Sequence, residues 1–129
     1  LRGTGFTAED FSEAQGWGCN LTLAPVIWGK SLAPLARDIA AKIGEQPCYI
    51  TYDIDSLDPA LAPGTGTPEI GGLTTWQAME FIRGLRGLNV VGCDLVEVSP
   101  PYDPSGNTAL VGANLIFELL STLPGVPYR

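Results

Sequence analysis

The sequence contains no histidine, and its 7 lysine and arginine residues are outnumbered by 14 aspartate and glutamate residues. Without histidine, the chain cannot form a self-contained Ser-His-Asp or Cys-His catalytic site, or a metal centre with imidazole ligands. The net charge of −7 argues against nucleic acid or an anionic membrane as a partner, because the chain has little charge with which to neutralise phosphates. A small cationic or neutral substrate fits this charge better.

Cysteines and long apolar runs are also scarce. Cys19, Cys48 and Cys93 are too few and too scattered for a disulfide framework. Cys48 and Cys93 lie in strand-like apolar runs, which predicts buried, reduced thiols and a cytoplasmic type of compartment. No apolar run approaches the roughly 20 residues that a membrane span needs, so a membrane partner is not expected.

The pattern of the 129 residues predicts an α/β fold with a parallel sheet, within one domain over residues 1–129. Residues 1–10 are typical of a strand end that runs into a loop. Further strands are predicted at 21–27, 48–52 and 89–96, and helices at 11–18, 31–43, 74–87 and 107–123. Three or four strands make a narrow sheet with an exposed apolar edge, which indicates part of a larger domain.

Three carboxylates follow the predicted strands. Asp53 and Asp55 end the strand at 48–52, and Glu97 ends the strand at 89–96. In an open α/β sheet, ligands bind beyond the carboxyl ends of the strands, so these side chains are expected on one edge. Converging carboxylates repel one another unless a cation such as Mn²⁺ or Mg²⁺ lies between them. Alternatively, the third carboxylate binds a cationic group of the substrate, for which guanidinium has the best geometry.

Each of these residues also has a simpler interpretation. An Asp-x-Asp pair after a strand is more often turn and capping chemistry than a metal site. Asp58 before Pro59 is typical of a turn, and Glu97 also suits a brace for the Pro-Pro loop that follows it. Several other residues have structural interpretations: Thr65 and Thr67 in local turns; Asp103 and Asn107 at a helix entry; Asn114 inside the core; Trp17, Trp28 and Trp76 in the core or at a subunit contact.

Two long blocks resemble a known family. Residues 52–59 (YDIDSLDP), 62–69 (APGTGTPE) and 71–74 (GGLT) form the first block, and residues 91–103 (VGCDLVEVSPPYD) form the second. Together they strongly resemble the arginase/agmatinase (ureohydrolase) family, and they look closer to its agmatinase and guanidino-acid hydrolase branch than to arginase proper. The resemblance covers essentially the whole chain.

This resemblance implies a three-layer α/β/α fold with two Mn²⁺ ions at the strand ends, with Ni²⁺ as an alternative metal. It implies hydrolysis of a guanidino compound to urea and an amine. Carried over by position, Asp53 bridges the two metals, Asp55 ligates one of them, Glu97 pairs with the substrate guanidinium, and Thr67 lines the pocket beside it. Such enzymes form trimers or hexamers, and a cytoplasmic or mitochondrial location is expected.

The chain departs from this family in one large respect. Members also carry Gly-Gly-Asp-His and Asp-x-His-x-Asp blocks upstream, which supply the other metal ligands and a proton-handling histidine. This chain has neither block, so it resembles a C-terminal part, contains no catalytic histidine, and is expected to be inactive alone. The resemblance does not decide which compound is the substrate among agmatine, 4-guanidinobutyrate, 3-guanidinopropionate and guanidine. A non-catalytic half-domain that binds a complementary chain is the alternative function.

Overall fold

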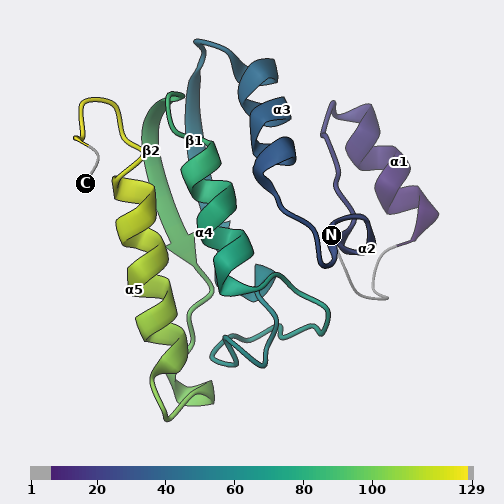
Figure 1. The fold of residues 1–129 in the computed structure, drawn as a ribbon. Coiled ribbons are helices and arrows are strands. Elements are labelled where there is room, and N and C mark those ends of the chain that lie inside the picture. Colours follow the sequence, from purple (N-terminus) through teal and green to yellow (C-terminus); the bar gives the residue numbers. More distant parts are fainter. Residues whose placement is uncertain (1–6, 128–129) are drawn as a thin grey trace.

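The computed structural model describes residues 7–127, and it contains two parallel strands within that range. Strands β1 (Pro47–Asp53) and β2 (Asn89–Val96) lie side by side in one sheet. The segment between them contains helix α4 (Thr75–Gly84), as a parallel connection requires (Figure 1). The α/β class and the parallel sheet predicted from the sequence are confirmed.

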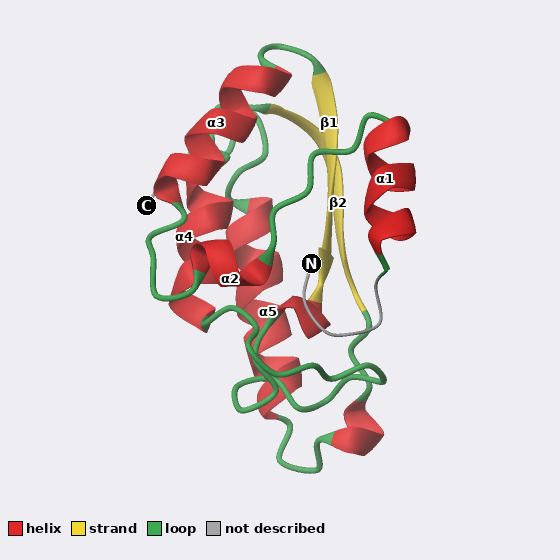
Figure 2. Ribbon diagram, turned by 90° about the vertical axis from the view of Figure 1, so that its right-hand side faces the viewer, coloured by secondary structure: helices red, strands yellow, loops and turns green. Residues whose placement is uncertain are grey.

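One face of this sheet is covered by helices. Helix α3 (Ala33–Ile43), α4 and α5 (Asn107–Leu120) all lie on the same side of the strands (Figure 2). Contacts join α3 to α4, α4 to α5, and α5 to β2. Helix α4 begins with a capping box: the Thr74 hydroxyl accepts from the Gln77 backbone N–H at 3.3 Å, and the Gln77 side-chain oxygen accepts from the Thr74 N–H at 3.1 Å.

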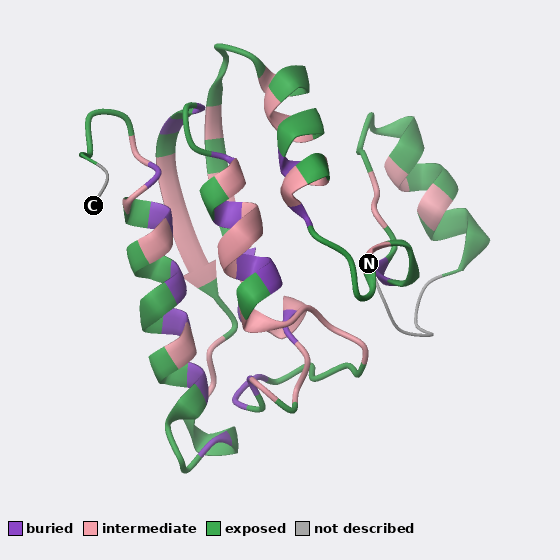
Figure 3. Cartoon of the chain, viewed as in Figure 1, coloured by how far each residue is buried: buried purple, intermediate pink, exposed green. Residues whose placement is uncertain are grey.

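The core lies between the sheet and these helices. Along β1, Cys48, Ile50 and Tyr52 alternate with more exposed neighbours, so one side of the pleat faces the helices. Tyr52 packs with Leu115 and Leu119 of α5, and the buried positions of α5 lie along one side of the helix (Figure 3). Cys48 and Cys93 face this core but are half-buried, so the prediction of buried thiols is only partly correct.

The opposite face of the sheet is exposed. Tyr49 is 60% exposed and Val91 is 65% exposed. Tyr49 lies over Gly92, where an added Cβ would come within 2.7 Å of its ring, and its hydroxyl donates to Asp94 at 3.0 Å. Helices α3, α4 and α5 thus form one helical layer of the predicted three-layer fold, while helix α1 (Ala8–Gly16) lies beyond the other side of the strands (Figure 2).

The N-terminal region differs from the expectation. Helix α1 (Ala8–Gly16) begins earlier than predicted, because Thr7 and Asp10 form a capping box; the rest of the predicted strand end, residues 1–6, lies outside the described range. The strand predicted at 21–27 is wrong. Helix α2 (Ala24–Ile27) occupies that position, with Pro25 in its first turn, where a missing N–H costs no hydrogen bond.

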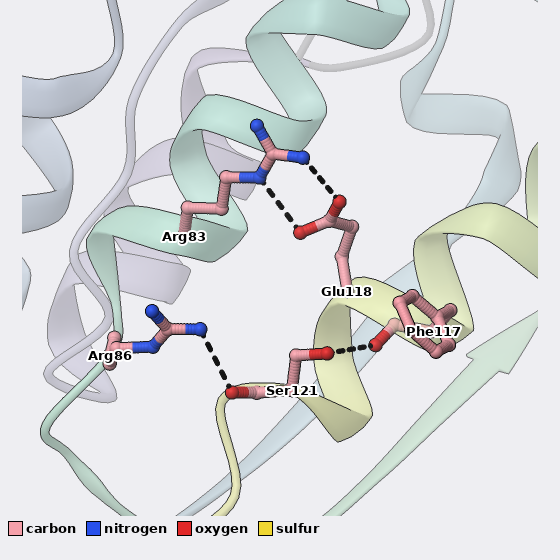
Figure 4. A network of polar contacts seen from close by, with 5 residues as sticks. All are labelled: Arg83, Arg86, Phe117, Glu118 and Ser121. Carbon is pink, nitrogen blue, oxygen red and sulfur yellow. Dashed lines mark hydrogen bonds and ion pairs between the residues drawn. The ribbon is translucent and has the colours of Figure 1, made fainter. Parts of the chain in front are cut away.

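Polar contacts hold α5 against α4 (Figure 4). The Arg83 guanidinium donates to both carboxylate oxygens of Glu118, with Nε 2.8 Å from Oε2, and this hydrogen bonding lowers the pKa of Glu118. Arg86 Nη2 donates to the Ser121 carbonyl at 3.1 Å. Because Arg83 is largely exposed, the ion pair adds little stability, and its role is to fix the position of α5.

Several predicted core residues are on the surface. Trp17, Trp28 and Trp76 are 74%, 55% and 49% exposed, so of the two predicted placements the core is wrong and the subunit contact stays a prediction. Asn114 is also exposed, and its Nδ2 donates to the Leu110 carbonyl one turn earlier instead of lying in the interior. None of the helices within residues 7–127 has the length and apolar character to cross a bilayer.

Candidate acidic site at the carboxyl ends of the strands

Two aspartates lie at the carboxyl end of β1. Asp53 is the last residue of the strand, and Asp55 lies in the 3₁₀ turn Ile54–Ser56 that follows. Asp53 Oδ1 accepts a hydrogen bond from the Asp55 backbone N–H at 3.0 Å, and both residues are half-buried. This is the turn chemistry that the simpler interpretation predicted, and it also holds the two carboxylates next to each other.

Glu97 lies at the same edge of the sheet. The strands run parallel and Asp53 pairs with Val96, so the residue after β2 lies beside the end of β1. Glu97 is exposed and has φ = 65°, which makes it the one non-glycine residue with positive φ within residues 7–127. A glutamate in the left-handed region is strained, and such strain is concentrated at functional sites.

The electrostatics of Asp53 show that negative charge accumulates at this edge. Burial raises the pKa of Asp53 above its ordinary value, and the charges of Asp55 and Glu97 raise it further; the hydrogen bond from the Asp55 N–H acts in the opposite direction. Asp53 is therefore close enough to each of the other two predicted carboxylates to feel its charge. A cation among them would relieve this repulsion.

Thr67 reaches the site from the long loop after the 3₁₀ turn. Its Oγ1 donates to Asp55 Oδ2 at 2.9 Å, across twelve positions of sequence, so the interpretation of Thr67 as a purely local turn residue is wrong. Thr65 is buried, and its hydroxyl has no hydrogen-bond partner in the described structure.

The same loop is anchored at its two ends. The Asp58 N–H donates to the Leu73 carbonyl at 3.0 Å, and the Leu73 N–H donates to the Ser56 carbonyl at 2.9 Å. Asp58 is the turn residue predicted from the sequence: its carboxylate accepts from Ala60 N at 3.0 Å and from Gly71 N at 2.9 Å. These bonds return the chain to the end of β1.

A second anchor holds the middle of the loop to the N-terminus of α5. The Gly64 N–H donates to the Thr108 hydroxyl at 2.8 Å, and the Ser99 N–H donates to the Gly64 carbonyl at 2.7 Å. Asn107 Nδ2 donates to the Leu61 carbonyl at 2.6 Å. Local sequence places Asn107 only at the helix entry, because its contact with Leu61 joins residues 46 positions apart and leaves no local pattern.

Asp103 organises this second anchor. Its carboxylate is buried, accepts from the Thr108 N–H at 2.6 Å and accepts from the Ser105 hydroxyl and N–H. Hydrogen bonds from the Ser105 hydroxyl and from Thr108 lower the pKa of Asp103 to about 2. The predicted role at a helix entry is confirmed, although Gly106 rather than Asn107 or Thr108 is the N-cap residue.

This pKa predicts an acid-sensitive junction. A carboxylate whose folded pKa is depressed stabilises the fold above its unfolded pKa of 3.8, and this stabilisation is lost as the pH falls toward about 2. We expect Asp103→Asn to lower the thermal midpoint by a few degrees near neutral pH, and the difference from wild type to shrink below about pH 4. Circular dichroism melts across pH check this. Asp38→Asn, on the exposed side of α3, is the control; a pH-independent Asp103→Asn difference would contradict the assignment.

The donor set fits part of a divalent metal site. Asp53 and Asp55 supply hard carboxylate oxygens, which suit Mn²⁺ or Mg²⁺. The pKa of Asp53 is raised first by burial and then by the charges of Asp55 and Glu97, and a bound ion would offset both effects. Over the part of the chain that the structure describes, however, no group of three or more His, Cys, Asp or Glu residues is arranged to hold a metal ion. A complete coordination shell therefore needs ligands from outside residues 7–127.

The fold and this edge define an α/β protein with an acidic site at the carboxyl ends of parallel strands. The profile of the arginase family matches residues 2–121, and the chain belongs to that family.

Individual relatives agree. The chain is 59% identical over 129 residues to the guanidinobutyrase of Pseudomonas aeruginosa, a match that covers 100% of the chain and 40% of the relative. It is 56% identical over 126 residues to the mitochondrial agmatinase of Gallus gallus, covering 98% and 37%. The solved proclavaminate amidino hydrolase of Streptomyces clavuligerus superposes with a TM-score of 0.87 at 36% identity, covering 95% of this chain and 40% of that one. The chain thus spans about 40% of the length of these proteins.

Proposed function

We propose that the chain forms one side of the active site of a metal-dependent hydrolase that cleaves a guanidino compound into urea and an amine. The observation that carries the proposal is the convergence of Asp53, Asp55 and Glu97 on one edge of the sheet, in a chain of the arginase family. The identity to a guanidinobutyrase and an agmatinase supports the class of substrate.

In this proposal the three carboxylates have different roles. Asp53 would help to hold both of two Mn²⁺ or Ni²⁺ ions, and Asp55 would help to hold one of them. When bound, the metal pair supplies an activated water. Glu97 pairs with the guanidinium through two parallel hydrogen bonds, and its strained backbone fixes the direction of its side chain. Water adds its oxygen to the guanidinium carbon, the bond from that carbon to the alkyl nitrogen breaks, and both protons of the water end on this nitrogen: R–NH–C(NH₂)₂⁺ + H₂O → R–NH₃⁺ + OC(NH₂)₂.

The remaining ligands and the proton-handling group come from outside this chain, which has no histidine. We therefore propose that residues 1–129 are the C-terminal part of a single ureohydrolase domain in a longer protein, which is called the full-length protein below. The full-length protein is proposed to be a homo-oligomer, a trimer or hexamer, in the cytoplasm or in mitochondria.

The substrate within the guanidino class is a finer question. Glu97 recognises the guanidinium that agmatine, 4-guanidinobutyrate and 3-guanidinopropionate share, so it does not distinguish them. The chain is 59% identical to a guanidinobutyrase and 56% identical to an agmatinase, and so small a difference favours neither substrate. Agmatine carries a second cation at its far end where the guanidino acids carry an anion, so residues near that end set the preference.

The test is urea release by the full-length protein after it has been freed of metal and reloaded with Mn²⁺. We expect urea from at least one of agmatine, 4-guanidinobutyrate and 3-guanidinopropionate, loss of activity with a chelator, and recovery with Mn²⁺ or Ni²⁺. The 129-residue chain by itself is expected to be poorly soluble and to release no urea, because it supplies only part of the metal site.

Two outcomes would contradict this proposal. If the full-length protein binds Mn²⁺ but releases no urea from any guanidino compound, the hydrolase assignment is wrong. Robust turnover by the 129-residue chain alone would show that its own residues complete the site.

A second candidate function rests on the exposed face of the sheet. Tyr49 and Val91 are more than half exposed on strands whose other face is covered, as expected for a half-domain that binds a complementary chain. This non-catalytic function predicts a stable complex of the chain with its partner and no urea release by that complex with Mn²⁺ present.

A further inference from the structure

The Thr67 hydroxyl is hydrogen-bonded to Asp55, a proposed metal ligand, whether or not it also contacts the substrate. It lies on the loop between β1 and α4, and its Oγ1 donates its one proton to Asp55 Oδ2 at 2.9 Å. The Asp55 backbone N–H in turn donates to Asp53 Oδ1 at 3.0 Å. Thr67 therefore contacts the side chain of Asp55, whose backbone in turn contacts the carboxylate of Asp53.

A hydrogen bond of this kind is compatible with binding of a cation by the same carboxylate. A carboxylate has about four lone-pair positions on its two oxygens, and the Thr67 hydroxyl takes one of them. A hydrogen bond on one oxygen restricts rotation of the carboxylate and thus the direction in which its other lone pairs point. Partners of this kind are the usual means by which proteins orient metal ligands.

The loop that carries Thr67 is fixed well enough to serve this purpose. Three residues earlier, Gly64 is bound on both sides, by its N–H to the Thr108 hydroxyl at 2.8 Å and by its carbonyl to the Ser99 N–H at 2.7 Å. Its close packing supports this, because an added Cβ would lie 2.9 Å from Asp103 Cβ. The segment that holds Thr67 beside Asp55 is therefore anchored to α5.

We propose that Thr67 is a positioning residue for Asp55, whose carboxylate the Thr67 hydroxyl fixes in the orientation needed to ligate a divalent cation. This inference rests on the proposed function for the identity of the cation. It assigns to Thr67 a role that differs from lining the pocket beside the guanidinium. The two roles are chemically compatible, because a hydroxyl that donates to Asp55 can still accept a hydrogen bond from a guanidinium.

The test measures Mn²⁺ binding by the full-length protein, with the free ion detected by electron paramagnetic resonance. Thr67→Val removes the hydroxyl at nearly constant shape, and Thr67→Ser retains it. We expect Thr67→Val to weaken Mn²⁺ binding by roughly 10–100-fold, the usual effect of losing an outer hydrogen-bond partner of a metal ligand. Thr67→Ser is expected to stay close to wild type. Because Thr67 is exposed, neither change should alter the melting of the metal-free protein.

The outcomes separate this inference from the proposed function. Unchanged Mn²⁺ affinity in Thr67→Val overturns the positioning role, and a raised KM at saturating Mn²⁺ would then assign Thr67 to substrate contact alone. Weakened Mn²⁺ binding in Thr67→Val supports the positioning role even if the wild type releases no urea, in which case only the hydrolase assignment fails. A wild type that binds no Mn²⁺ overturns both.

Discussion

Changing Asp53 to asparagine in the full-length protein is expected to abolish urea release. The introduced amide would keep an oxygen to accept the hydrogen bond from the Asp55 N–H, so the turn after β1 is retained. It would lose the charge that a ligand shared between two cations supplies. Metal ions contribute several kcal/mol to transition-state stabilisation, and each 1.36 kcal/mol is a factor of ten in rate, so a loss of about 10³-fold or more follows. The measurement is urea release at saturating Mn²⁺.

Metal binding and stability show whether this loss has the proposed cause. We expect Mn²⁺ affinity to fall by more than about 100-fold, because even outer partners of metal ligands cost about 10–100-fold. The metal-free variant should be no less stable than wild type. The folded pKa of Asp53 is raised, so its ionised form costs stability at neutral pH, a cost that diminishes as the pH falls through that pKa toward the ordinary value of 3.8. Asp38→Asn on the exposed side of α3 is the matched control. Wild-type Mn²⁺ affinity in Asp53→Asn would exclude Asp53 as a ligand.

The elements that position the site could be predicted from local sequence. The apolar runs of β1 and β2 and the capping box at Thr74 are signals confined to a few residues, and the structure agrees with them. The placement of Asp53 and Glu97 on one edge followed from parallel strands alone. These predictions succeeded because periodicity and strand direction do not depend on distant contacts.

The errors concern features that depend on the surroundings. The run at 21–27 is apolar enough for a strand, but Pro25 fits the first turn of α2 equally well, and periodicity does not decide between them over so few residues. Asn114 lies on a mostly apolar helix, yet whether its position faces the core depends on which side of α5 meets the sheet. The exposure of Trp17 likewise depends on what packs beside it.

The anchoring of the loop was also beyond local sequence. The bond between Gly64 and Thr108 joins residues 44 positions apart, and the bond between Thr67 and Asp55 joins residues twelve apart. The strained backbone of Glu97 has no sequence signal either, since glutamate does not favour positive φ. The sequence could therefore predict which carboxylates lie at the same edge of the sheet, while the contacts that hold the loop beside them are visible only in the structure.

Gly72→Ala is expected to disrupt the close packing that returns the loop after β1 to the end of that strand. An added Cβ at Gly72 would lie 2.4 Å from the Asp58 nitrogen and the Leu57 carbonyl carbon, and 2.6 Å from the Leu57 oxygen. These are backbone atoms at the point where the loop returns to the end of β1, so no side-chain rotation relieves the clash. Overpacking typically costs about 1–3 kcal/mol, and this site belongs at or above the upper end of that range.

Gly72→Ala is expected to lower the rate of urea release as well as the stability of the fold. Relief of the clash requires Leu73 to move away from Ser56 and Asp58, to which it is hydrogen-bonded, and the displacement passes to Asp55 in the adjoining turn. A misplacement of about 1 Å costs about 10²-fold in rate, so we expect urea release to fall by about that factor even at temperatures where the variant is folded.

Gly66→Ala is the matched control for the stability measurement. It lies in the same loop, where an added Cβ meets no atom within 4 Å, and its backbone is outside the positive-φ region. We expect its free energy of unfolding to stay within about 0.5 kcal/mol of wild type. Thermal unfolding of both variants of the full-length protein, with and without Mn²⁺, makes the comparison. If both alanine variants melt together with wild type, the close approach of Gly72 to the Leu57–Asp58 backbone does not hold the loop. If only Gly72→Ala is destabilised, this approach is what returns the loop to the edge of the sheet where the carboxylates meet.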